Sequence, residues 1–189
     1  MKTQQEHEDF FAQLRHNAAE YYAGDVGDFN VHNIYEALEL AVEVFDVNSI
    51  KIILANRDVE NLNVTHAYAC AMVDEQDEHN PDRAEMCKLL LDDTRCVPTD
   101  YHLEMALTYK MVEQARQMVA CDRFLWDNIE TVLYSVVIEL EGVLKGNDYD
   151  EDTKAAALAV MQTIVAQPVV KEIMGRNDEI AEKIAHIDK

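Results

Sequence analysis

A chain of 189 residues is long enough to bury the core of one domain or of one short repeat array. Its 5 glycines and 3 prolines are few for a β-sandwich or barrel, whereas residues that favour helices are plentiful. Acidic residues outnumber basic ones by 37 to 16, and the formal net charge is −21. Such a surface repels nucleic acid and anionic lipid. Composition therefore predicts an all-α protein that binds neither directly, and it leaves a basic partner or simple solubility as the role of the charge.

The sequence predicts a cytoplasmic protein without a membrane segment. No stretch approaches the roughly 20 apolar residues of a membrane-spanning helix, and the N-terminus has no apolar signal region. The four cysteines form no CxxC pair, and Cys70, Cys87 and Cys121 lie in or beside apolar runs, which is typical of reduced, buried thiols.

The first predicted element is an amphipathic capping helix within residues 1–30. Its apolar side chains recur at helical spacing, and Gly24 and Gly27 then interrupt the pattern. These side chains are Phe10, Phe11, Leu14, Ala18, Tyr21 and Tyr22.

A pair of short helices begins near residue 34 and recurs. The segment "ALELAVEVFDVNSIKIILANRDV" from Ala37 aligns without a gap with "HLEMALTYKMVEQARQMVACDRF" from His102. Between them, "AYACAMV" and "RAEMCKLLLDDTRCV" form a similar pair, separated by the acidic insertion "DEQDEHNPD". Lys51, Lys88 and Arg116 mark the second helices at spacings of 37 and 28 residues, close to the period of about 33 that helix-pair solenoids show.

A more degenerate fourth pair follows and completes the predicted array. Its first helix is expected around Val132–Leu140, and its second helix ends before Pro168. A last helix within 170–189 would cap the stack, because a terminal element lacks one neighbour. The sequence thus predicts a single domain over 1–189, with about four degenerate helix pairs over 34–170.

These segments resemble divergent ankyrin repeats. The register of Ala37, Leu38 and Ala41, followed by "KIIL" from Lys51, is similar to the two helices of that repeat, and "CKLLLDDTRCVPTD" matches a common variant of its second half. The resemblance is clear over 34–124 and weak to 170. Three consensus features differ: the opening TPLH is approached only by Thr65-His66, Phe45-Asp46 replaces the Gly-His turn, and the Gly-Ala-Asp ending is absent. The resemblance implies a stacked array that binds other proteins.

No motif in the sequence predicts catalysis, a cofactor or a metal. His66 and Cys70 have a spacing that can hold one metal ion, but no second pair accompanies them. The acidic run from Asp148 begins like a calcium loop but has Thr153 and Ala159 where that loop needs glycine and glutamate. Nucleotide-binding and nucleophile motifs are missing as well. We expect a protein that is not an enzyme.

Acidic clusters and aromatic residues near the predicted loops are the candidate partner-binding residues. Acidic side chains would steer a basic partner, and aromatic side chains would anchor it, unless the aromatics only fill the grooves between repeats. The predicted set is Asp74, Glu75, Asp77, Glu78, Asp92, Asp93, Tyr101, Trp126, Asp148, Tyr149, Asp150, Glu151 and Asp152.

Two functions are compatible with this pattern. The first is an interaction module that binds, and modulates or inhibits, a protein with a basic surface. The second is an acidic decoy of phage or mobile-element type that mimics DNA and blocks a nucleic-acid-binding defence enzyme. The sequence identifies neither the partner nor the oligomeric state.

Overall fold

The computed structural model describes residues 4–21, 33–56, 59, 61–73 and 81–187. Within those residues it contains eleven α-helices and no named strand, which confirms the predicted all-α class. The chain divides into two compact units, Met1–Cys96 and Val97–Lys189. We describe each unit by itself.

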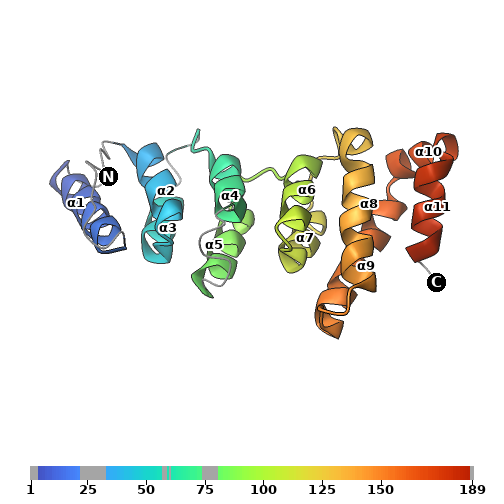
Figure 1. Ribbon diagram of the computed structural model, residues 1–189. Coiled ribbons are helices and arrows are strands. Elements are labelled where there is room, and N and C mark those ends of the chain that lie inside the picture. Colours follow the sequence, from blue (N-terminus) through green and yellow to red (C-terminus); the bar gives the residue numbers. More distant parts are fainter. Residues whose placement is uncertain (1–3, 22–32, 57–58, 60, 74–80, 188–189) are drawn as a thin grey trace. The chain divides into compact units, whose positions relative to one another are not determined.

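The first unit contains helices α1 to α5 (Figure 1). Helix α1 (Gln4–Tyr21) packs against α2 (Ile34–Glu43), and α2 pairs with α3 (Val47–Leu54). Helix α4 (Val64–Val73) pairs with α5 (Pro81–Asp92). The two pairs stack, since α2 contacts α4 and α3 contacts α5. Their core consists of fully buried side chains that include Leu38, Ile50, Ile53, Tyr68, Met86 and Leu90.

The second unit repeats this pairing. Helix α6 (Asp100–Thr108) pairs with α7 (Val112–Val119), and α8 (Ile129–Lys145) pairs with α9 (Glu151–Ala166). As in the first unit, the first helices of the two pairs contact each other (α6 with α8), and so do the second helices (α7 with α9) (Figure 1).

The C-terminal region forms two helices where one was predicted. Helices α10 (Pro168–Arg176) and α11 (Asp178–Ile187) pack on each other and on α8. The break lies at Asn177, whose backbone is extended (φ −134°) and whose side chain accepts a hydrogen bond from the Ile180 N–H at 3.2 Å. An asparagine in this position ends one helix and caps the next, a signal that helical spacing alone does not reveal.

The turns between α2 and α3 and between α6 and α7 have the same geometry. Phe45 and Lys110 both lie in the left-handed region, at φ 52° and 60°. In each turn the residue after it donates a backbone hydrogen bond to the fifth residue before: Asp46 to Ala41 at 2.8 Å and Met111 to Ala106 at 2.7 Å. This is the Schellman motif, which usually has glycine in the left-handed position. The gapless sequence alignment therefore corresponds to a repeated three-dimensional turn.

Lys110 allows a test of the backbone strain in this turn. The variants Lys110→Gly and Lys110→Ala both lose the ion pair with Glu139, so the difference between them reflects the backbone. We expect the glycine variant to be more stable by about 1 kcal/mol, because glycine adopts positive φ without a Cβ clash.

The matched control is Gln162, an exposed residue in the middle of α9. There glycine should be less stable than alanine by about 1 kcal/mol. Urea unfolding of the four variants measures both differences in stability. If glycine and alanine ranked in the same order at both positions, the backbone strain at Lys110 would be contradicted.

Candidate functional site

The turn between α8 and α9 carries the densest group of predicted binding residues in the described structure. We call Asp148, Asp150, Glu151 and Asp152 the acidic turn. The Asp150 carboxylate accepts a hydrogen bond from the Thr153 N–H at 2.8 Å, so it caps α9. Hydrogen bonds from the Thr153 side chain and backbone lower the pKa of Asp150.

The remaining carboxylates of the acidic turn face solvent. Asp148, Glu151 and Asp152 are exposed, and no ion pair in the described part of the chain involves them. The basic residue just before the turn, Lys145, contacts Glu141 at 2.6 Å instead. Their negative charge is therefore available to a partner. Tyr149 lies in the same turn, where its ring packs against Gly146 so closely that a Cβ there would lie 2.8 Å from it.

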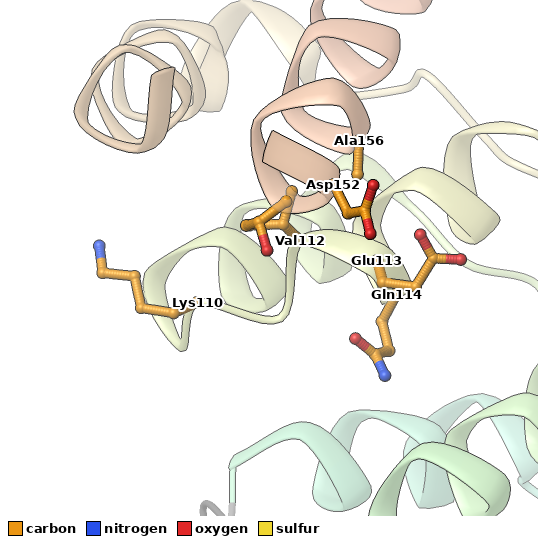
Figure 2. Close-up of a pocket in the computed structure, with 7 residues that line it drawn as sticks. Lys110, Val112, Glu113, Gln114, Asp152 and Ala156 are labelled. Atoms are coloured by element: carbon orange, nitrogen blue, oxygen red, sulfur yellow. The ribbon is translucent and has the colours of Figure 1, made fainter. Parts of the chain in front are cut away.

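A pocket of about 300 Å³ lies beside the acidic turn, between the first turns of α7 and α9 (Figure 2). Val112 and Ala156 are its buried apolar residues, at 2% and 8% exposure. Polar walls come from both helices, with Glu113 and Gln114 on α7 and Asp152 and Thr153 on α9; Lys110 completes the lining.

The charged groups of the pocket differ in what they contact. Arg116 holds Glu113 through two hydrogen bonds of 2.6 and 2.7 Å, and these lower the pKa of Glu113. Lys110 extends away from Asp152 (Figure 2) and pairs with Glu139. No cation in the described residues contacts Asp152, which makes it the uncompensated charge of the pocket.

Tyr101 and Trp126 do not lie at the acidic turn. Tyr101 is 58% exposed in the first turn of α6, and Trp126 packs on Phe124 with ring centroids 4.5 Å apart, just before α8. The 17 residues of α8 separate this end of the second unit from the acidic turn by about 25 Å. Of the predicted aromatic residues, only Tyr149 accompanies the carboxylates.

The predicted residues of the first unit have different environments. Asp92 is exposed and pairs with Lys88 at 2.6 Å. Asp93, by contrast, is 3% exposed, so its carboxylate lies inside the protein and is not a surface for a partner. Asp74, Glu75, Asp77 and Glu78 lie outside the described residues.

Asp93 and Arg95 form a structural cluster that sequence reasoning missed. Arg95 binds both carboxylate oxygens of Asp93 at 2.9 Å and also donates to the backbone carbonyls of Leu54, Asn56 and Val59 at 3.0 to 3.1 Å. The guanidinium group thus joins the end of α3 to the loop after α5. The only sequence signal was an arginine two residues after an aspartate pair, which is too common to be informative.

Thr99 and His102 form a second missed pair. The Thr99 N–H donates to Nδ1 of His102 at 3.2 Å, in a capping box at the start of α6. Burial lowers the pKa of His102, and burial also raises the pKa of the adjacent Asp100, whose carboxylate accepts from the Asn128 N–H. The sequence pattern that could have predicted this capping box is the threonine followed three residues later by histidine in "TDYH".

The metal ligands considered from the sequence, His66 and Cys70, do not form a metal site within the described residues. His66 Nε2 and Cys70 Sγ lie 3.6 Å apart, but no group of three potential metal ligands occurs there. Burial raises the pKa of the Cys87 thiol to about 12, so this thiol stays protonated near neutral pH.

No single helix among the described residues is both long and apolar enough to cross a membrane; α9 and α10 reach that length only as a pair bent by 79°. Comparison with known proteins found no matching family model, no similar curated protein and no similar solved structure.

Removal of the Arg95 guanidinium should destabilise the protein strongly. Arg95→Ala leaves the Asp93 charge buried and three carbonyls without their donor, so we expect a loss of about 3 kcal/mol in the free energy of unfolding. The control is Arg116→Ala, which breaks an exposed, solvent-screened ion pair and should cost much less. Equal losses in urea unfolding would show that the Arg95 cluster is not structural.

His102 should make the protein less stable as the pH is lowered. Its folded pKa lies below the unfolded value of about 6.5, so protonation favours the unfolded chain. The contribution of neutral His102 is therefore present above about pH 6.5 and is lost as the pH falls through the folded pKa.

The variant His102→Gln keeps a side-chain acceptor at the capping-box position but does not titrate. Its free energy of unfolding should fall less than that of the wild type as the pH is lowered from neutrality. Parallel pH profiles for the two proteins would contradict this role.

Proposed function

We propose that this protein is a non-enzymatic binding module that binds, and thereby modulates or inhibits, a partner protein with a basic surface. The observation that carries the proposal is the acidic turn, whose carboxylates at Asp148, Glu151 and Asp152 are exposed and have no cation of their own within the described structure. Complementary charge accelerates association and selects the partner.

The helix arrangement supports a rigid, repeat-built scaffold of ankyrin-like type for this module. Within each unit the two helix pairs stack so that the first helix of one pair contacts the first helix of the other, and the second helix contacts the second. The left-handed turn at Phe45 and Lys110 occupies the position at which ankyrin repeats have their Gly-His turn. The capping box of Thr99 and His102 at the start of α6 resembles the threonine and histidine of the TPLH opening. A preformed surface of this kind binds without a large loss of conformational entropy.

Charge neutralisation on the acidic turn tests the proposal. The triple variant Asp148→Asn, Glu151→Gln, Asp152→Asn removes three negative charges, and it leaves the Asp150 cap intact. A control triple variant, Glu172→Gln, Asp178→Asn, Glu182→Gln, removes three exposed charges from α10 and α11.

The three proteins are compared in affinity capture from lysate, washed at about 50 mM and about 500 mM salt, with and without added DNA. We expect the acidic-turn variant to lose a basic partner that the wild type and the control retain at low salt. Equal capture by all three would refute the acidic turn as the binding surface. Release of nucleic-acid enzymes by DNA would instead support the decoy alternative.

A further inference from the structure

We propose that the pocket between α7 and α9 binds the guanidinium group of an arginine side chain on the basic partner. The inference rests on the proposed function and names the chemical group recognised beside the acidic turn. It also separates the pocket from the rest of the acidic surface, because it assigns one carboxylate, Asp152, as the charged anchor.

The size of the pocket suits one side chain. Its volume of about 300 Å³ lies at the lower end of the range for small-molecule sites, which is roughly 300–1,000 Å³. Val112 and Ala156 supply an apolar surface for the methylene stem of an incoming residue. The surrounding groups, Glu113, Gln114 and Asp152, supply oxygen acceptors from two different helices.

The charge of the pocket favours a cation. The N-termini of α7 and α9 contribute about half a positive charge each, Arg116 contributes one more beside Glu113, and Lys154 contributes another in the first turn of α9. Four carboxylates in the caps and first turns of these helices outweigh them: Glu113, Asp150, Glu151 and Asp152. Lys110 does not fill the site, because its ammonium pairs with Glu139.

The arrangement of acceptors distinguishes arginine from lysine. A guanidinium group has five N–H donors in a planar fork and can reach a carboxylate and an amide oxygen together, whereas an ammonium group acts as a compact point charge. Asp152 on α9 supplies a carboxylate to the pocket lining, and Gln114 on α7 supplies an amide. Recognition should therefore be stronger for arginine than for lysine at equal charge.

The test uses the full chain with N-acetylarginine amide and N-acetyllysine amide as probes. Backbone amide shifts in NMR titrations report both the affinity and the place of binding. We expect a dissociation constant on the order of millimolar for the arginine probe. The largest shifts should fall on Val112–Gln114 and Asp152–Ala156, and the lysine probe should bind about threefold more weakly.

Matched variants separate the pocket from general electrostatic attraction. Asp152→Asn should weaken the arginine probe about fivefold, whereas Asp148→Asn, the same change outside the pocket lining, should weaken it less than about twofold. Gln114→Ala serves as a second pocket variant that leaves the charge unchanged, and it should reduce the preference for arginine over lysine. Thermal melting verifies that each variant is folded.

Three outcomes would overturn the proposal: equal affinity for both probes, equal losses in Asp152→Asn and Asp148→Asn, or shifts spread over all acidic helices. The affinity capture distinguishes this failure from failure of the proposed function. A partner lost by the triple variant but fully retained by Asp152→Asn would refute the pocket and leave the acidic turn as the binding surface.

Discussion

Most helices of this protein are too short to be stable alone, and the whole structure depends on their burial against one another. Helices α3 and α7 have 8 residues each, well below the roughly 12–15 residues at which an isolated helix becomes marginal in water. Each one is stable because its apolar face is covered by its own partner and by the corresponding helix of the adjacent pair. Side chains such as Ile50, Ile53, Ala115 and Met118 are at most 1% exposed for this reason.

In two of the helix pairs the same turn connects the first helix to the second. The left-handed residues Phe45 and Lys110 reverse the chain with the same backbone hydrogen bonds. Arg95 contributes differently, because from the loop that follows α5 it donates to the carbonyl of Leu54 at the end of α3 and to those of Asn56 and Val59 beyond it. Backbone groups at helix ends are thus paired within the fold, which leaves the exposed side chains near these ends free for other roles.

The acidic turn illustrates this division between structure and surface. Asp150 stabilises α9 as its cap, while Asp148, Glu151 and Asp152 keep their charge at the surface. The same composition gives different results elsewhere: Asp93 is buried with Arg95, and Asp92 is exposed beside Lys88. Net charge alone therefore does not identify a binding surface, and the local cations decide which carboxylates are available.

The sequence by itself determined the all-α class, the helix pairs and the repeated register of Ala37 with His102, because the burial of apolar faces imposes helical periodicity on the chain. It also located the carboxylates of the acidic turn. Helical spacing did not reveal the local cap at Asn177 that separates α10 from α11. The sequence also did not determine that Asp93 is buried, since its partner Arg95 meets the carbonyls of Leu54, Asn56 and Val59 only in the folded chain. The pocket at Asp152 and the separation of Tyr101 from the acidic turn were likewise decided by tertiary structure. Glu113 and Asp152 are distant in sequence and meet only because α7 packs against α9.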